Sequence, residues 1–241
     1  MSDFYDSLSS VYDIVFPVNP AATDFLSRDV HPGSRILDLA CGTGTYALAL
    51  ARKGHFVVGI DLDERMIAEA KRKDPDGAVV FLAGDMLDAG SLCAGRTFDL
   101  AYCIGNSFVH LPGREQAAAF LSTVHGLLAD GGRFIIQIVN FDRVLANNDV
   151  ILPTIDRKSD SIILTRRYDI GGDGCVSFVT ELTISGEKTI NSVRLLALCS
   201  AELTDMLETA GYRVYGVYGG YDGSSFDDRS PALIVKACKY Q

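Results

Sequence analysis

Short apolar runs alternate with longer amphipathic segments along the first 140 residues of the chain. In the longer segments, apolar residues recur three and four positions apart, which is typical of helices that bury one face. Such alternation predicts an α/β fold with a mostly parallel sheet that helices cover on both faces. The short runs are rich in β-branched residues and have the length of buried strands; they span residues 36–39, 56–60, 78–83, 98–104 and 133–139.

The expected helices have recognisable start and stop signals. They cover residues 3–28 with breaks at Pro17 and Pro20, residues 44–53, a segment capped by Asp63, a segment that follows Pro112-Gly113 and is ended by Gly131-Gly132, and a segment capped by Ser200.

The pattern changes after the fifth apolar run. Three strand-like runs follow, separated by glycine-containing hairpin turns, and they predict an antiparallel β-meander inserted over residues 160–199. Two later runs, 212–218 and 232–237, complete a Rossmann-like, seven-stranded sheet. We expect a single domain over residues 1–241, with residues 1–30 as an N-terminal helical cap. The three runs of the meander are Ile162 to Ile170, Cys175 to Ile184 and Thr189 to Cys199.

Composition and charge argue against several classes of partner and against a metal site. The net charge is −9 and no cluster of Lys and Arg is present, which argues against nucleic acid as a partner. The chain has no run of about 18 apolar residues and no signal-peptide pattern at its start, so we expect no membrane contact and a cytoplasmic location. Its six cysteines lack CxxC spacing and its four histidines are scattered, so no metal site is expected.

A glycine turn follows the first strand. Residues 42–47, Gly-Thr-Gly-Thr-Tyr-Ala, satisfy the dinucleotide pattern G-x-G-x-x-A, but that pattern alone is weak. Asp38 precedes the turn by four residues, and its carboxylate would repel a pyrophosphate. S-adenosylmethionine has no phosphate and carries a cationic amino group and a sulfonium. Asp38 therefore favours S-adenosylmethionine over NAD.

Two further acidic residues, Asp61 and Asp85, lie at the ends of the next two strands. Asp61 ends the second strand, where a carboxylate can accept hydrogen bonds from both ribose hydroxyls. Asp85-Met86 follows the third strand, where a carboxylate can accept from the adenine amine and a methionine can pack on the ring. Because the carboxyl ends of parallel strands meet at one edge of a sheet, these acids are expected at one ligand site.

At these residues the chain resembles a known family. The run from Asp38 to Gly44, with Asp61 and Gly84-Asp85-Met86, resembles the class I S-adenosylmethionine-dependent methyltransferases. Within that superfamily, the run from Cys103 to Pro112 and the triplet Asn140-Phe141-Asp142 are similar to the glycine and sarcosine N-methyltransferases.

The acidic marks and the resemblance together indicate a set of site residues. By resemblance, Asn106 and His110 lie beside the reacting groups as catalytic residues. Tyr5 and Tyr12 fold over the cofactor, with Tyr5 on the substrate side, and core packing of one helix face stays open as the alternative for both tyrosines. Tyr168 and Tyr221 are predicted on the substrate side because they fall on the insertion and in the late loop. The predicted cofactor-binding residues are Tyr12, Asp38, Ala40, Cys41, Gly42, Gly44, Asp61, Leu62, Met66, Gly84, Asp85, Met86, Cys103, Ile104, Gly105 and Ser107.

One departure from the resemblance concerns the substrate. In glycine N-methyltransferases an arginine that holds the substrate carboxylate precedes the Asn-aromatic-Asp triplet, and here that position is Val139. A valine cannot form the bidentate pair that a carboxylate favours. Arg143, Arg166 and Arg167 stay open as substitutes.

The sequence thus predicts methyl transfer from S-adenosylmethionine to a small molecule, with an amine nitrogen favoured over oxygen. Two alternatives stay open: a module that binds S-adenosylmethionine without turnover, and a nicotinamide-dependent oxidoreductase. The protein is expected to be a monomer or a homo-oligomer formed through the insertion.

Overall fold

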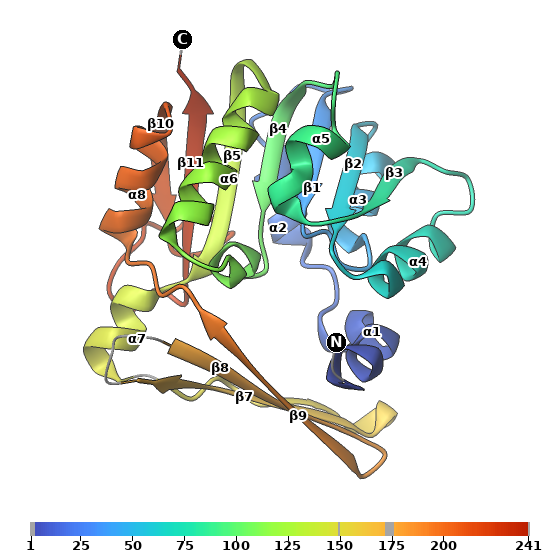
Figure 1. The fold of residues 1–241 in the computed structure, drawn as a ribbon. Helices are drawn as coiled ribbons and strands as arrows, with labels where there is room; N and C mark the ends of the chain where they lie inside the picture. Colours follow the sequence, from blue (N-terminus) through green and yellow to red (C-terminus); the bar gives the residue numbers. More distant parts are fainter. Residues whose placement is uncertain (1–2, 149, 172–175, 241) are drawn as a thin grey trace.

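The computed structural model describes residues 3–148, 150–171 and 176–240, and it describes side chains from residue 8 onward. Its centre is a seven-stranded sheet with the strand order β10-β11-β5-β4-β1-β2-β3 (Figure 1). The five strands from β5 to β3 are parallel, and β11 runs antiparallel between β5 and β10. This confirms the predicted Rossmann-like sheet. Its strands are β1 Arg35–Leu39, β2 Phe56–Asp61, β3 Val79–Ala83, β4 Phe98–Cys103, β5 Leu128–Val139, β10 Tyr212–Tyr218 and β11 Ala232–Lys239.

Helices cover both faces of this sheet (Figure 1). Side chains alternate in β1: Leu37 and Leu39 join the apolar cluster under α6 and α8, whereas Ile36 joins the cluster under α2, α3 and α4. The helices are α1 Asp3–Val15, α2 Pro20–Ser27, α3 Thr45–Arg52, α4 Glu64–Arg72, α5 Ala89–Leu92, α6 Arg114–Leu127, α7 Phe141–Asn147 and α8 Ser200–Thr209, with 3₁₀ turns η1 Met86–Asp88, η2 Ser107–His110 and η3 Lys158–Asp160. Among the described residues, no helix combines the length and the apolar character needed to cross a membrane.

Two predicted helix boundaries are wrong. Gly131-Gly132 does not end α6, because Leu128 already pairs with Phe98 as the first residue of β5. Gly131 takes a φ of 71° inside that strand, and the pairing skips from Leu128 to Arg133, so the two glycines form a bulge. Ser200 does not cap α8 with its side chain; its backbone N–H donates to Asp142 Oδ2 at 2.7 Å.

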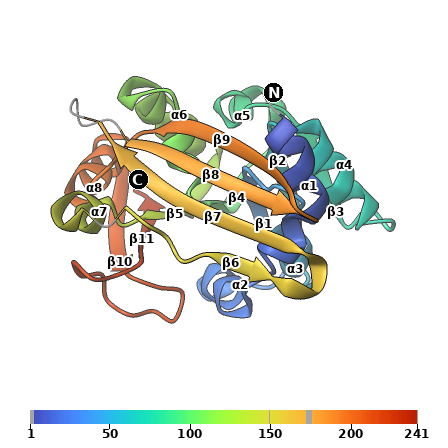
Figure 2. The same ribbon diagram turned by 90° about the horizontal axis from the view of Figure 1, so that it is seen from below.

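The insertion forms a second, four-stranded antiparallel sheet with the order β6-β7-β8-β9. It lies across the carboxyl ends of the central strands, beside α1 (Figures 1 and 2). The sequence predicted three of its strands and missed the short β6, and the predicted third run ends at Leu195 rather than Cys199. The predicted start of the second run, Cys175, lies outside the described residues. The strands are β6 Ile155–Arg157, β7 Ile162–Ile170, β8 Val176–Ile184 and β9 Glu187–Leu195.

The N-terminal helix α1 is attached to this second sheet. Leu8 and Val15 share a buried apolar cluster with Ile162, Leu164 and Leu182. The helix and the insertion thus form one cover over the end of the central sheet.

The glycine turn after β1 gives a stability prediction. Gly44 has a φ of 72°, and a Cβ at this position would lie 2.5 Å from Cζ of Phe81. We expect Gly44→Ala to lower the free energy of unfolding by about 2–4 kcal/mol, because it adds a clash to the left-handed backbone strain. Gly54→Ala is the matched control: its φ is 86°, but no atom lies within 4 Å of the added Cβ. Equal losses for the two variants in urea unfolding would contradict the close packing at Gly44.

Candidate active site

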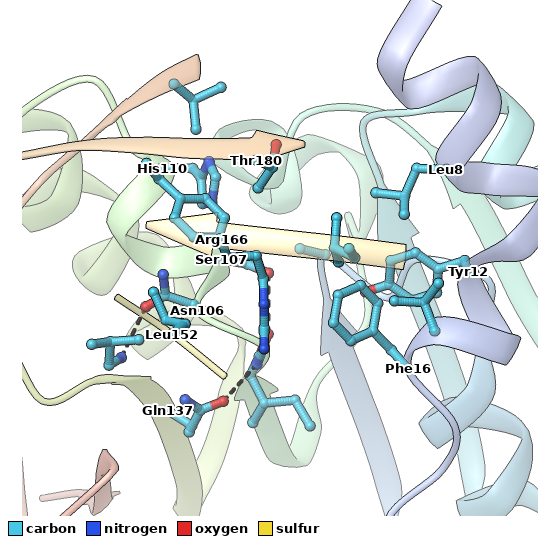
Figure 3. A pocket seen from close by; sticks show the side chains of 18 of the residues that line it. Leu8, Tyr12, Phe16, Asn106, Ser107, His110, Gln137, Leu152, Arg166 and Thr180 are labelled. Atoms are coloured by element: carbon cyan, nitrogen blue, oxygen red, sulfur yellow. Dashed lines mark hydrogen bonds between the residues drawn. The ribbon is translucent and has the colours of Figure 1, made fainter. Parts of the chain in front are cut away.

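A cavity of about 560 Å³ lies between the carboxyl ends of the central strands and the inner face of the second sheet (Figure 3). That volume is in the range of small-molecule sites. The central sheet and its loops contribute Asp38, Ala40, Cys41, Thr45, Tyr46, Ile104, Gly105, Asn106, Ser107, His110, Gln137 and Val139. Helix α1 and the residues after it contribute Leu8, Tyr12, Val15, Phe16 and Pro17, and the insertion side contributes Leu152, Leu164, Arg166, Tyr168, Phe178, Thr180, Asn191 and Val193.

Asp61 is held rigidly at the glycine turn. The backbone N–H of Gly42 donates to its Oδ2 at 2.7 Å, and the N–H of Asp63 donates to its Oδ1 at 3.0 Å. Burial raises the pKa of this carboxyl above its ordinary value in spite of these two bonds. Each carboxylate oxygen has a further lone pair, so Asp61 can accept hydrogen bonds from a diol.

Asp38 is a buried carboxyl group on the wall of the cavity. Its residue is 3% exposed. Burial raises its pKa to about 7, and the negative charge of Asp61 adds to the shift. A cationic ligand group in the cavity would favour the ionised form of Asp38, whereas a phosphate would disfavour it.

The loop after β4 is fixed by bonds to β5. Asn106, at a φ of 70°, accepts a hydrogen bond from the Val139 N–H at its Oδ1, 2.9 Å away. The N–H of Gly105 donates to Oε1 of Gln137 at 2.8 Å (Figure 3). Asn106 thus sets the position of the loop and lines the cavity.

His110 ends the 3₁₀ turn of this loop and faces the cavity. Partial burial lowers the pKa of its imidazole below the ordinary value, which keeps the ring neutral at pH 7. A neutral imidazole has one nitrogen that can accept a proton.

Helix α1 closes over the glycine turn. The Tyr12 ring lies 3.7 Å from where a Cβ on Gly42 would be. Asp13 accepts hydrogen bonds from the hydroxyls of Thr43 and Thr45, at 2.5 and 2.8 Å, and pairs with Lys73 at 2.5 Å. These contacts fasten α1 to the turn, so Tyr12 lines the site. The side chain of Tyr5 lies outside the described residues.

Some predicted site residues do not line the cavity. Cys103 is fully buried in the core, Leu62 is mostly exposed, and Met66 is a buried residue of α4. Asp85 accepts from the Leu87 N–H as the cap of η1, at 2.9 Å. Predicted residues that line the cavity are Tyr12, Asp38, Ala40, Cys41, Ile104, Gly105, Asn106, Ser107, His110 and Tyr168. Predicted residues that are not in its lining are Gly42, Gly44, Asp61, Leu62, Met66, Gly84, Asp85, Met86 and Cys103.

Tyr221, predicted on the substrate side, is not among the residues that line the cavity. Its hydroxyl donates to Gln137 Oε1 at 3.3 Å, and its ring packs edge-on against Phe25. Tyr221 stands behind Gln137 because the late loop folds against α2 rather than over the cavity. It supports the wall instead of lining it.

The triplet Asn140-Phe141-Asp142 connects segments that are far apart in the chain. Asn140 is fully buried, accepts from the Arg143 N–H, and donates to the carbonyls of Asp227 and Ser230. Asp142 accepts from the Ser200 N–H. The triplet thereby holds α7, α8 and the late loop against the end of β5.

The sequence predicted Tyr168 on the substrate side, but it did not show which face of the insertion forms the wall of the cavity. Alternate residues of β7 line it, namely Leu164, Arg166 and Tyr168. Period-two alternation was visible in the sequence, but it does not say which of the two faces meets the rest of the protein. Gln137 was missed because its neighbours in β5 are apolar.

Comparison with known proteins agrees with this geometry. The family described as "Methyltransferase domain" matches residues 36–132, which include the glycine turn and the loop after β4. Glycine N-methyltransferase of Mus musculus is 30% identical over 128 residues, and the match covers 48% of this chain and 44% of the mouse protein. Residues 36–132 of the chain are therefore similar to a methyltransferase domain. Cypemycin N-terminal methyltransferase of a Streptomyces species is 29% identical over 84% of this chain and 82% of its own length.

The fold of the chain also matches solved structures. An S-adenosylmethionine-dependent methyltransferase from Clostridium acetobutylicum superimposes with a TM-score of 0.81 at 18% identity, covering 99% of this chain and all of that one. The chain spans less than half the length of the mouse relative that it matches.

The residues of the site fit S-adenosylmethionine. Asp61 presents a fixed acceptor to a ribose, Asp38 presents a buried carboxyl to a cationic group, and the left-handed Gly42 leaves room beneath Tyr12. We expect Asp61→Ala to weaken S-adenosylmethionine binding at least about tenfold, since a hydrogen bond to a charged group is worth roughly 1.5–3 kcal/mol.

Calorimetric titration measures this effect. Asp76→Ala, which removes an exposed carboxylate in the turn after α4, serves as the control and should bind as the wild type does. Unchanged affinity in Asp61→Ala would remove Asp61 from the cofactor site.

Proposed function

We propose that this protein transfers a methyl group from S-adenosylmethionine to an amine nitrogen of a small molecule. The observation that carries the proposal is the shared cavity, in which Asp38 of β1 and the neutral His110 line one space under the second sheet. The names of two relatives support the choice of nitrogen, because the mouse protein is named a glycine N-methyltransferase and the Streptomyces protein a cypemycin N-terminal methyltransferase.

The chemistry requires little of the protein beyond alignment and proton transfer. S-adenosylmethionine supplies a methyl group already activated by the sulfonium. The acceptor nitrogen forms a bond to the methyl carbon as the carbon–sulfur bond breaks, and the electron pair stays on sulfur. The nitrogen then carries one proton too many. His110 is neutral and faces the cavity, so we assign it as the group that accepts this proton.

The remaining residues position the acceptor and exclude water. The Asn106 amide is oriented by the Val139 N–H, and Tyr12 and Phe16 close the α1 side. Alignment of reactants can supply about 7–11 kcal/mol of the barrier reduction, so a fixed loop and a closed cover are expected to matter.

Release of S-adenosylhomocysteine on a panel of small amines, carboxylic acids and phenols tests the proposal. Turnover with amines supports it. Turnover confined to phenols or acids would contradict amine methylation, and tight binding of S-adenosylmethionine without turnover on any acceptor would favour a passive binding module.

A further inference from the structure

The inner face of the second sheet contains one polar row between apolar ones. Arg166 of β7 pairs in register with Thr180 of β8, and Thr180 pairs with Asn191 of β9. All three line the cavity. The next row toward one end consists of Tyr168, Phe178 and Val193, and Leu164 pairs with Leu182 on the other side. We name Arg166, Thr180 and Asn191 the polar row.

Arg166 has a charge that the described part of the protein does not neutralise. Its Nη2 donates to the Pro153 carbonyl at 2.9 Å, and its Nε is buried with no hydrogen-bond partner among the described residues. Within that same part of the chain, no Asp or Glu forms an ion pair with it. A guanidinium has five N–H donors and is best satisfied by a carboxylate in a two-bond fork.

Arg167, the next residue along β7, differs from Arg166 because it forms an ion pair. Arg167 points to the outer face of the same strand and pairs with Asp169 at 3.0 Å. Its charge is therefore matched within the protein. Of these two neighbours, only Arg166 offers its charge to the cavity.

The charges of the cavity lie on opposite walls. The acidic group Asp38 comes from the central sheet, and Arg166 comes from the insertion. In Figure 3, Arg166 and Thr180 reach the cavity from strands of the insertion, whereas Asn106 and Gln137 come from the central-sheet side. The wall that faces the glycine turn across the cavity is thus cationic.

We infer that the methyl acceptor is an amine that also carries a carboxylate, and that the polar row of the insertion binds this carboxylate. The inference rests on the proposed amine methylation and adds the substrate class. Arg166 supplies the charge and the fork, and the Thr180 hydroxyl and the Asn191 amide supply neutral donors beside it. Tyr168 and Phe178, in the neighbouring row, pack against the apolar part of the acceptor.

Matched acceptor pairs test this inference. The probes are glycine with methylamine, β-alanine with ethylamine, and phenylalanine with 2-phenylethylamine, each pair differing by one carboxylate. We expect the wild type to favour the carboxylated member of at least one pair. Arg166→Gln should lower kcat/KM for that member about 100-fold, mainly through KM, and leave its decarboxylated partner within about twofold, because loss of a charge-assisted fork affects only the anion.

Control variants separate this role from folding and from cofactor binding. Arg167→Gln should behave as the wild type, and Arg166→Lys should restore part of the preference because it keeps the charge without the fork. The affinity for S-adenosylmethionine, measured by calorimetry, should change less than about twofold in Arg166→Gln.

Three results would overturn the inference. One is a wild type that favours the decarboxylated members, and another is an Arg166→Gln variant that keeps the wild-type preference. The third is a tenfold loss of S-adenosylmethionine affinity in Arg166→Gln, which would show that Arg166 holds the carboxylate of the cofactor instead. In each case, turnover of any amine would still leave the proposed function standing.

Discussion

Asp38→Asn is expected to weaken S-adenosylmethionine binding roughly 10–100-fold and to stabilise the ligand-free protein at pH 8. The two effects have one cause. Burial raises the pKa of Asp38 to about 7 from an ordinary value of 3.8, so above pH 7 the folded protein holds a buried negative charge. At 1.36 kcal/mol per pKa unit, the ionised group costs at most about 4 kcal/mol, and Asn removes that cost.

The pH dependence gives the sign of the effect. A raised pKa in the folded state contributes stability that is present at low pH and is lost as the pH rises through about 7. The gain from Asp38→Asn should therefore be largest at pH 8 and shrink toward pH 5. In a protein of this size 1 kcal/mol moves Tm by about 2–4 °C, so thermal unfolding resolves the difference.

The affinity of the wild type for S-adenosylmethionine should follow the ionisation of Asp38. Below about pH 7 Asp38 takes up a proton, and the attraction for a cationic ligand group is lost. As the pH is lowered, calorimetry should show that the wild type loses affinity for S-adenosylmethionine, whereas the affinity of Asp38→Asn should change less. A variant that is less stable than the wild type at pH 8, or that binds equally well, would contradict the assignment of Asp38.

His110→Gln is expected to lower kcat by about 100-fold or more while changing S-adenosylmethionine affinity little, because general bases contribute typically 10²–10⁴-fold. The imidazole must be neutral to accept a proton. Burial lowers its pKa below 6.5, so the wild-type rate should fall only as the pH drops below that lowered pKa. Steady-state rates on a turned-over amine, measured from pH 5 to 8, test both statements.

His31→Gln is the matched control, since His31 is exposed and lies away from the cavity. It should leave kcat and the pH profile unchanged. If the rate of His110→Gln falls at low pH in the same way as the wild-type rate, the proton is accepted by another group.

Local patterns predicted the central fold well. The glycine turn, Asp38 and Asp61 lie within 24 residues, and strand ends in a parallel sheet meet at one edge, so the acidic side of the site followed from the sequence. Elements that depend on contacts distant in the chain were missed. Helix α7 is one example, because its cap Asn140 is fixed by carbonyls of residues 227 and 230.

The sequence left Arg143, Arg166 and Arg167 open as cationic residues of the site, and it could not choose between Arg166 and Arg167 for a physical reason. Arg166 and Arg167 are adjacent, and only the docking of the sheet decides which of them faces the cavity. A register shift of one residue would exchange their roles. Tyr221 shows the same limit, since the fold of the late loop against Phe25 removed it from the cavity.

Transfer of a trideuterated methyl group tests the central claim most directly. The protein is incubated with S-adenosylmethionine labelled as CD₃ and with the best amine from the panel, and the product is examined by mass spectrometry and NMR. We predict one CD₃ group on nitrogen and an equal amount of S-adenosylhomocysteine, with both formed about 100-fold more slowly in His110→Gln. A label on oxygen or carbon, or binding of S-adenosylmethionine with no label transferred to any acceptor, would contradict the claim.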